Sequence, residues 1–522
     1  MWFRLKHVSI LLISLLFLLV SCAKDEGVNV ELDTVSVRIT SPFNLESLPP
    51  NRSVEFTGEV RVEDPNDFSS LKVIWESDID GILHKGGVDS NGLAKFTSNG
   101  LSKNIHYIRL YVYNLKNESI FDQTIVYNAI WLYEISNDNN NSKIYWSKTE
   151  DTDFESYELY RSYNKYSLDQ KEGSPIYTTT DVNDTTYNDT EALLGNKHFY
   201  KAFIKRKTNT HSYIGSNKDS IIPGDFIDLD YPIYKVINDP TRNYAYGIVN
   251  VESIYSSNKT GYGLVFINTT KQEVEKRILT NIRFTDLDID PSGHYLYLCS
   301  RSQIIHKINL NTQNFERTLV ATRSAHKIEV GIDRLYYHMT PPTSGATEFR
   351  IYDLLNNTNI AYNSTMTDAY SSFSHGDFEL GENGILYHGG SNSSSASLSK
   401  ISTENDVFSL PKQWDSRNYQ KALITLNNNK LYWNQYLIDT DLNVLGQFLD
   451  NGDDVDIEAV APNGTLALGW RRLFKTENQT IVKKIPVNYD VATFLNNNYL
   501  LLINNENPIS NENNSRVFFY KL

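Results

Sequence analysis

The chain has 522 residues and 40% of them are hydrophobic, which excludes a disordered chain and exceeds the length of one ordinary domain. Its 34 Tyr and 23 Phe against only 3 Met, with frequent Asn, Asp, Gly and Ser, favour strands joined by turns. The formal charge of −14 argues against nucleic acid as a partner and against direct adhesion to anionic lipid.

Residues 1–21 are typical of a secretory signal peptide. Arg4 and Lys6 precede an apolar run at 8–20, which is too short to span a bilayer because a spanning helix needs about 20 residues. The following Leu19-Val20-Ser21-Cys22 resembles the lipobox of bacterial lipoproteins, which implies covalent lipid on Cys22. Several acyl chains at one point would anchor the protein stably in a membrane. A plain cleaved signal with an incidental cysteine is the alternative.

The residues after Cys22 indicate where the anchored chain goes. Lys24, Asp25 and Glu26 resemble the export signal that sends lipoproteins to the cell surface in one group of Gram-negative bacteria rich in outer-membrane nutrient importers. The resemblance implies an outer-membrane protein displayed outside the cell, and a polar tether on the periplasmic face is the alternative. Loss of the signal peptide changes the formal charge to −16. The other cysteine, Cys299, lies in an apolar run and is expected in the core.

After a polar tether at 22–33, residues 34–127 predict a first β-sandwich. Short apolar-alternating segments at 37–39, 54–58, 71–75 and 106–112 are separated by turn residues. Their order resembles bacterial immunoglobulin-like domains of the PKD kind, and the resemblance implies that Trp75 belongs to the core.

Residues 128–222 predict a second sandwich. Segments at 143–146, 154–161 and 198–205 resemble the strands of a fibronectin type III domain, which implies a core containing Trp146, Tyr157 and Leu159. Such domains serve mainly as stiff spacers, and an adhesive role is the alternative.

Residues 223–522 carry an internal repeat. A turn with Asn, Asp or Gly precedes an apolar strand and then a second strand, as in 290–293, 295–298 and 304–310. Seven such units recur at roughly 35–50 residues, and a lone sheet of this kind must stack on neighbours to bury both faces. The repeat resembles YVTN- and WD40-like β-propellers, although the WD dipeptide is missing. We therefore predict an all-β chain with two N-terminal sandwiches followed by a seven-bladed propeller; further sandwiches are the alternative.

The end of the chain predicts how the ring closes. Residues 517–522 look like the third strand of a blade with nothing after it. The segment 226–231, just before the first repeat, is the candidate for the missing outer strand, because closure removes exposed sheet edges.

No catalytic motif is present in the sequence, so we predict a protein that is not an enzyme. His375, Asp377 and Glu379 could form a metal or acid–base cluster, but an inter-blade loop that bonds turn backbone groups is the preferred interpretation. Because propellers also host glycosidases and lyases, a glycan-degrading enzyme is the rival hypothesis. Carboxylates or histidines from several blades at the channel mouth would favour it, whereas an apolar plug would favour binding.

Oxygen-rich side chains gather at Asp450, Asp453, Asp454 and Asp456. Calcium prefers such ligands, but their spacing does not match the twelve-residue calcium loop, and an ordinary propeller turn explains them equally. We predict no metal site and no cofactor besides the lipid, with calcium as the open alternative at these four acids.

Aromatic residues in polar stretches are the candidates for recognition. Trp414 and Tyr419 follow a proline, and Trp470 precedes Arg471. Rings on loops can stack on sugars or anchor a protein interface. The alternative for Trp470 is the end of a core strand, and Trp433 is expected in the core.

Together these observations predict a non-enzymatic, surface-exposed lipoprotein of the outer membrane. It would act as a binding or accessory subunit of a transport, assembly or secretion complex, or capture a glycan or peptide. A purely structural adhesin is a third hypothesis.

Overall fold

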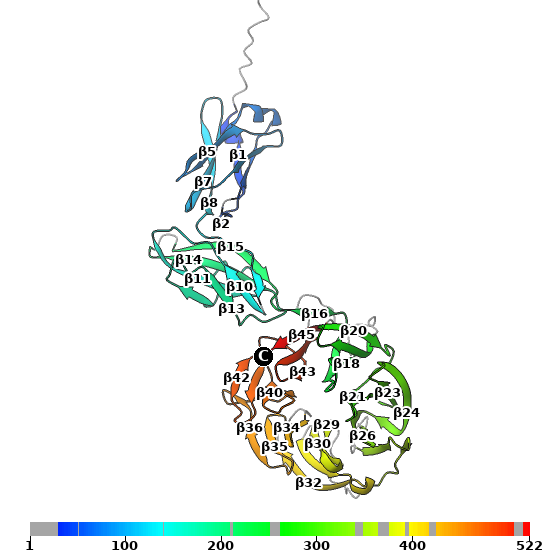
Figure 1. Cartoon of the computed structure of the whole chain (residues 1–522). Helices are drawn as coiled ribbons and strands as arrows, with labels where there is room; N and C mark the ends of the chain where they lie inside the picture. The colour runs from blue at the N-terminus through cyan, green and yellow to red at the C-terminus, as the bar shows by residue number, and fades with distance from the viewer. Residues whose placement is uncertain are drawn as a thin grey trace, which may run out of the picture. The chain divides into compact units, whose positions relative to one another are not determined.

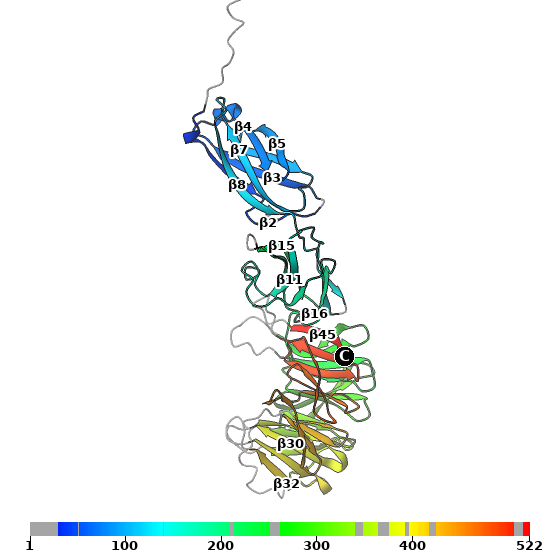
Figure 2. The same ribbon diagram turned by 90° about the vertical axis from the view of Figure 1, so that its left-hand side faces the viewer.

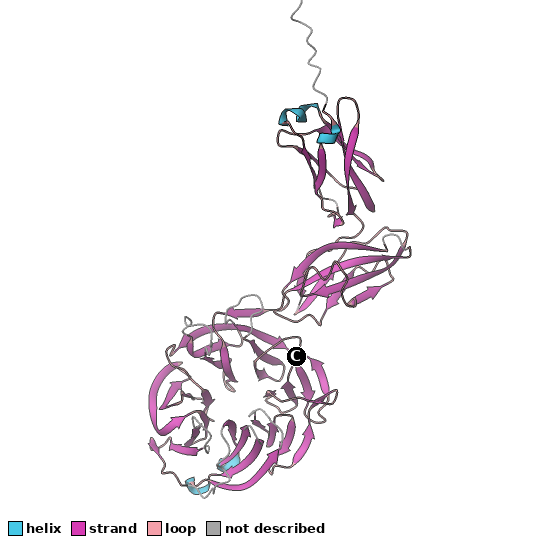
Figure 3. Ribbon diagram, turned by 180° about the vertical axis from the view of Figure 1, so that it is seen from behind, coloured by secondary structure: helices cyan, strands magenta, loops and turns pink. Residues whose placement is uncertain are grey.

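The computed structural model describes residues 30–50, 52–138, 140–208, 212–250, 261–339, 348–363, 375–391, 396–416, 424–505 and 515–522. The chain divides into two compact units. Unit 1 comprises Met1–Asp189 and Lys197–Ile221, and unit 2 comprises Thr190–Asn196 and Ile222–Leu522. Strands dominate both units, and the described helices are short 3-10 turns, as Figure 3 shows in cyan.

The first part of unit 1 is built from two facing sheets. Alternation creates the shared core: in β7, Ile108, Leu110 and Val112 are buried while the residues between them are partly exposed. Trp75 is fully buried, with its ring centroid 5.9 Å from that of Phe56. Figure 2 shows β4, β7 and β8 side by side in the larger sheet. The smaller sheet has the order β1 (Ser36–Ser41), β3 (Val54–Arg61), β6 (Leu93–Ser98), and the larger has the order β2 (Glu46–Ser47), β8 (Ser119–Tyr127), β7 (Ile105–Tyr113), β4 (Lys72–Ser77), β5 (Gly81–Gly87).

The second part of unit 1 has a three-stranded and a four-stranded sheet. Trp146, Tyr157 and Leu159 are buried, as the sequence predicts. The core also contains a polar network. The buried Asp189 carboxylate binds the Arg161 guanidinium at 2.7 Å and accepts a hydrogen bond from the Tyr200 hydroxyl at 2.9 Å. The strand orders are β13 (Thr186–Asp189), β10 (Asn141–Tyr145), β9 (Ser136–Asp138) and β12 (Tyr177–Thr179), β11 (Phe154–Ser162), β14 (His198–Arg206), β15 (Tyr213–Ile221).

Among its described residues, unit 2 forms seven four-stranded antiparallel sheets, called blades below. Six contain consecutive strands. They are β17 (Ile233–Asn238), β18 (Tyr244–Asn250), β19 (Tyr262–Asn268), β20 (Glu273–Ile278); β21 (Asp286–Ile289), β22 (Tyr295–Cys299), β23 (Ser302–Asn309), β24 (Asn314–Ala325); β25 (Lys327–Val330), β26 (Arg334–Met339), β27 (Glu348–Asp353), β28 (Thr358–Asn359); β29 (His375–Leu380), β30 (Ile385–Ser391), β31 (Ala396–Ser402), β32 (Ser409–Ser416); β33 (Ile424–Asn427), β34 (Lys430–Trp433), β35 (Tyr436–Asp439), β36 (Val444–Gln447); and β39 (Ala459–Val460), β40 (Leu466–Gly469), β41 (Arg472–Lys475), β42 (Ile481–Lys484).

The remaining blade joins the two ends of unit 2. Its order is β16 (Phe226–Leu229), β45 (Ser515–Lys521), β44 (Tyr499–Asn504), β43 (Val491–Asn496), so the segment expected at 226–231 supplies the outer strand. Phe226 pairs with Phe518, and Asp228 pairs with Arg516. The first strands of successive blades contact one another around the whole ring, from β17 through to β43 and back to β17. Figure 1 shows this ring, and the strand order defines unit 2 as a β-propeller.

Blade interiors are more apolar than a half-exposed sheet allows. Six of the seven residues of β19 are buried, and Trp433 and Cys299 are fully buried, as expected. Both faces of a blade are covered by neighbours, so its middle strands read as continuous apolar runs. Short 3-10 turns lie at η1 (Leu32–Thr34), η2 (Pro65–Ser70), η4 (Glu382–Gly384) and η5 (Glu404–Asp406). Within the described part of the chain, none of the helices has the length and apolar character needed to cross a membrane.

Candidate functional site

Charged residues line the channel on the first strands of four blades. Lys235 of β17 forms an ion pair with Asp286 of β21, and Lys327 of β25 lies 3.1 Å from Asp377 of β29. Asp286 is only 1% exposed. Both lysines carry a pKa above the usual value, because the opposing carboxylates outweigh the burial that would lower it. The channel lining here is polar, and its charges are paired between neighbouring blades.

A second set of contacts ties three of these first strands, β21, β25 and β29, to the first strand of the following blade. The Asp286 carboxylate accepts from Ile328 N at 3.0 Å, and Asp288 accepts from Val330 N at 2.7 Å. Glu329 accepts from Leu380 N at 3.4 Å, and Glu379 accepts from the backbone of Leu426. We call Asp286, Asp288, Glu329 and Glu379 the inter-blade carboxylates. They satisfy backbone N–H groups at the inner edge of the next blade, where no further strand can do so.

Three of the inter-blade carboxylates hold their protons unusually tightly. Burial raises the pKa of Asp288 to about 7 and, together with the nearby Asp377 charge, raises that of Glu379 to about 8. Burial and the neighbouring Asp288 and Glu379 raise the pKa of Glu329 well above its ordinary value. Asp377 differs, because its pKa is lowered. Burial would raise this pKa, but the positive charges of Lys327 and Lys235 outweigh the effect of burial. Protonated and ionised acids therefore stand side by side at neutral pH.

Two histidines lie behind the channel, in the core between the blade β25–β28 and the blade β29–β32. His338 and His388 are fully buried, and their ring centroids lie 6.0 Å apart, against Phe349 and Phe378. His338 Nε2 lies 3.1 Å from the Gly376 carbonyl oxygen and donates to it. Burial lowers the pKa of both rings, to about 4 for His388. They are neutral packing groups at physiological pH.

The sequence predicts an inter-blade loop around His375, Asp377 and Glu379, and the structure corrects this prediction. Residues 375–380 form the inner strand β29, and the two acids line the channel instead of capping a turn. The His375 side chain lies outside the described residues. A repeated pattern marks these positions: the first strand of each of three blades contains a charged residue, an apolar residue and an acid, in Asp286-Leu-Asp288, Lys327-Ile-Glu329 and Asp377-Phe-Glu379. The spacing places both polar side chains on one face of the strand.

The four calcium candidates are occupied in other ways or lie apart. Asp450 of β37 (Leu449–Asp450) binds Arg472 at 2.6 Å, and Asp454 of β38 (Asp453–Asp454) accepts from Gln447 at 2.7 Å. Asp453 is exposed at the hairpin tip, and Asp456 follows the hairpin. Among the described residues, no group of three or more His, Cys, Asp or Glu side chains has the arrangement of a metal site.

Trp470 and Arg471 form the two-residue turn between β40 and β41. Strand β41 follows the turn directly, and the outer strand β42 begins at Ile481. Trp470 therefore does not end a core strand: its side chain is 69% exposed. The Arg471 Nε donates to Ile485 O at 3.0 Å, and the Arg472 guanidinium lies 5.8 Å from the Trp470 ring centroid.

Among the remaining candidates for recognition, lipidation and export, the structure describes only the backbone of Trp414. Trp414 was expected on a loop, but it lies in strand β32, where it pairs with Leu398; its side chain is outside the description. Tyr419, the lipidation residue Cys22, and the export residues Lys24, Asp25 and Glu26 all lie outside the described residues.

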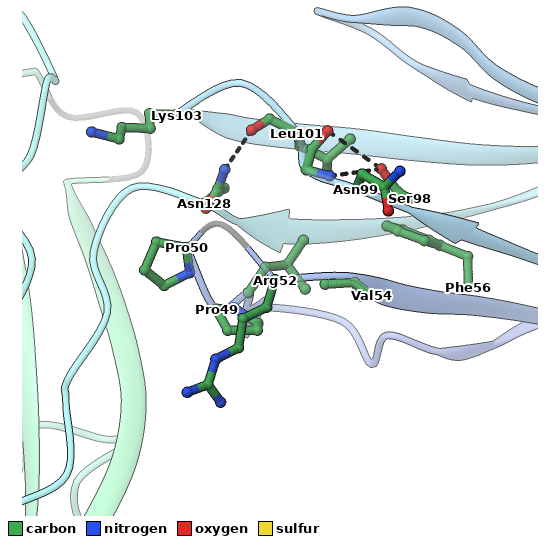
Figure 4. A pocket seen from close by; sticks show the side chains of 12 residues that line it. Pro49, Pro50, Arg52, Val54, Phe56, Ser98, Asn99, Leu101, Lys103 and Asn128 are labelled. Carbon is green, nitrogen blue, oxygen red and sulfur yellow. Dashed lines mark hydrogen bonds between the residues drawn. The ribbon is translucent and has the colours of Figure 1, made fainter.

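Unit 1 has a small pocket of about 70 Å³ at one end of the first sandwich (Figure 4). Pro49, Val54, Phe56 and Leu101 give it an apolar wall. Arg52 and Lys103 lie at its rim, but the Lys103 ammonium is already paired with Glu150 at 2.6 Å. A drug-sized ligand needs several times this volume.

No protein-family model matches the chain, and no curated protein matches it. Solved structures similar to it include hydrazine synthase of Kuenenia stuttgartiensis, 12% identical, which covers 54% of this chain and 94% of its own with a TM-score of 0.41. The Cps50 (Swd1) β-propeller domain of Myceliophteria thermophila is 10% identical over 57% of this chain and 99% of its own, with a TM-score of 0.44. The WD40 repeats of RRP9 are 11% identical over 56% and 97%, with a TM-score of 0.41. At such identities a similarity concerns the chain path and not activity.

Proposed function

We propose that the protein is a lipid-anchored outer-membrane protein that displays its propeller outside the cell as a non-enzymatic binding or accessory subunit. The observation that carries the proposal is Cys22, placed directly after an apolar run and Leu19-Val20-Ser21. The acids and the lysine that follow it, at 24–26, support display on the cell surface. Acyl chains on one residue are sufficient for stable anchoring, because each buried methylene contributes about 0.8 kcal/mol.

The arrangement that we propose is two spacer sandwiches, immunoglobulin-like and fibronectin-like, followed by a seven-bladed propeller. The three-plus-four strand order of the second sandwich supports the fibronectin assignment. Ile105 and Tyr127 of the first sandwich share one hydrophobic cluster with Trp146 of the second, which supports a stiff spacer. Propeller ends are broad and built from loops and turns, which suits binding.

Carboxylates from three blades lie at the channel, which is the arrangement expected of the rival enzyme and not the apolar plug expected of a binding protein. Their engagement nevertheless supports a structural task over catalysis. Each inter-blade carboxylate bonds a backbone amide of the next blade, and the two lysines are paired with acids. These groups have a structural task that accounts for their burial. The proposed partner is a protein complex of the outer membrane that serves transport, assembly or secretion.

Two measurements in the native host test this proposal. Proteinase K added to intact cells should degrade the propeller while a periplasmic control protein survives, and affinity purification should recover an outer-membrane transport or secretion component in stoichiometric amount. A Cys22→Ala variant should lose both results. Protection of the wild-type chain until the cells are lysed would overturn surface display.

One observation favours a glycan-degrading enzyme as the second candidate. Asp377 has a lowered pKa and Glu379, two residues along the same strand, has one of about 8, and such divergence is typical of acid–base pairs. Purified protein should then release reducing sugar from a polysaccharide, and Asp377→Asn and Glu379→Gln should each abolish release. Release that survives in both variants, or no release at all, rejects this candidate.

A further inference from the structure

The turn that presents Trp470 has an unusual backbone. Trp470 has φ 33° and Arg471 has φ 64°, so both central residues lie in the left-handed region. Two-residue hairpin turns of this kind favour Asn and Gly, because bulky side chains are strained there. A large aromatic ring placed at such a position, and 69% exposed, is a feature that folding alone does not require.

Contacts on both sides hold this turn in place. Arg471 N donates to the Tyr489 hydroxyl at 3.2 Å, and Arg472 binds the Asp450 carboxylate at 2.6 Å. Gly469 packs so closely that a Cβ there would lie 2.2 Å from the Asp456 carbonyl oxygen. The ring is therefore offered to solvent by a fixed backbone, which lowers the entropy cost of binding.

The surface around Trp470 is polar. Arg472 connects the turn to the 450–454 hairpin, and Arg471 connects it to Asn488 at 3.3 Å. The exposed residues of these two neighbouring segments are polar or glycine apart from Leu449, which is 39% exposed: Asn451, Gly452, Asp453, Asp454, Asn488 and Asp490. A protein hot spot needs an apolar surround that excludes water, and one half-exposed leucine does not provide it.

A sugar matches this surface better. A pyranose has one face of C–H groups that can pack on an aromatic ring, and its hydroxyls lie around the edge, where carboxylate, amide and guanidinium groups can bond them. The acids at 453, 454 and 490 and the chain's charge of −14 disfavour an anionic ligand. We infer that Trp470 is the stacking platform of a binding site for neutral glycans, formed with the 450–454 hairpin and residues 488–490.

This inference rests on the proposed surface display and adds a glycan ligand to the proposed protein partner. The test is native electrophoresis of the purified full chain in gels containing dextran, mannan, xylan, amylopectin or mixed-linkage β-glucan. At least one should retard the wild-type protein, and Trp470→Ala should weaken the affinity about tenfold, which corresponds to about 1.4 kcal/mol. Trp470→Tyr should retain most of the retardation, and Leu355→Ala, which removes a 71% exposed side chain from another blade, should leave it unchanged.

Melting temperatures of all variants should match the wild type within about 2 °C, which separates lost binding from lost folding. Retardation by none of the five polysaccharides, or equal retardation of wild type and Trp470→Ala, overturns the inference. If Trp470→Ala instead releases a protein partner, the surface is a protein interface and the glycan inference is wrong, while the binding function stands. Failure of surface display in the proteinase test would overturn the proposed function itself.

Discussion

The buried charge of Asp189 should contribute strongly to the stability of the second sandwich. Its side chain is 1% exposed and engages both Arg161 and Tyr200. We expect Asp189→Ala to destabilise unit 1 by about 3–5 kcal/mol, because it leaves the guanidinium without its partner in a largely buried place. Calorimetry of the full chain should show the unit 1 transition moved to lower temperature.

Asp169 provides the matched control for that change. It binds Lys201 and Lys218 in the same sandwich, but its side chain is 46% exposed. Water screens such pairs, so Asp169→Ala should cost less than about 1 kcal/mol. Equal losses for the two variants would contradict the account of Asp189.

At Trp470 the fold and the inferred ligand make opposing demands. Trp470→Asn should relieve backbone strain and stabilise unit 2 by about 0.5–1 kcal/mol, since Asn adopts the left-handed region readily. Scanning fluorimetry should then show a small rise in melting temperature together with lost glycan retardation. A melting temperature below that of Trp470→Ala would show that the turn is not strained.

Single residues were predictable where burial follows from an apolar pattern. Trp75, Trp146, Trp433 and Cys299 are buried as their neighbours in the sequence indicate. The exposure of Trp470 could not be predicted, because it depends on the short strand β41, which the sequence pattern did not separate from the following turn. A turn of two non-glycine residues with positive φ has no reliable signal in the sequence.

The acids on the first strands of the blades make the stability of unit 2 depend on pH. Asp288 and Glu379 have a folded-state pKa of about 7 and about 8, above the ordinary carboxyl value. A raised carboxyl pKa means that the folded chain binds more protons than the unfolded chain between the two values. The stabilisation is therefore full below the unfolded pKa and is lost as pH rises through about 7 to 8. The melting temperature of unit 2 should fall as pH rises from about 5 to about 8 and then level off.

Glu379→Gln should remove part of that loss. The amide oxygen can still accept from Leu426, but it carries no charge, so the variant should melt a few degrees above the wild type at pH 9 and close to it at about pH 4, below the unfolded pKa. Asp377→Asn is the control on the same strand: its pKa is lowered, so the change should destabilise at both pH values. A variant Glu379→Gln that melts lower at pH 9 would contradict the raised pKa.

At the element scale, apolar strands were easier to predict than charged ones. The apolar strands at 295–298 and 304–310 lie within or overlap β22 and β23. The inner strand β29 was taken for a loop, because its His, Asp and Glu residues conceal the apolar alternation. The inter-blade bonds that make those charges useful depend on a neighbouring blade, which local sequence does not reveal.

At the scale of the whole molecule, ring closure through β16 should dominate the stability of unit 2. Replacing residues 226–229 by Gly-Ser-Gly-Ser removes the pairing of Phe226 with Phe518 and the Asp228–Arg516 ion pair at 2.8 Å. We expect a large drop in melting temperature, because opening the ring exposes sheet edges and apolar blade faces.

The matched control is the same replacement at 481–484, the outer strand β42 of another blade, whose residues are all exposed. It shortens one blade without opening the ring and should cost much less. An equal effect of the two replacements would contradict closure as the source of stability.

The all-β character and the propeller could be predicted from the sequence, because strands and turns recur at a regular spacing. The inferred glycan surface could not, because it combines a hairpin, a turn and a loop that contact one another only in the folded unit 2. The proposed membrane address, in contrast, rests on about five consecutive residues and does not depend on the fold.

Mass spectrometry of the amino-terminal peptide from the native host's membrane fraction would detect the proposed lipid anchor itself. We expect a peptide that begins at Cys22 and carries the added mass of a diacylglyceryl group and an acyl chain. A peptide that begins elsewhere, or one that begins at Cys22 without lipid, would contradict it.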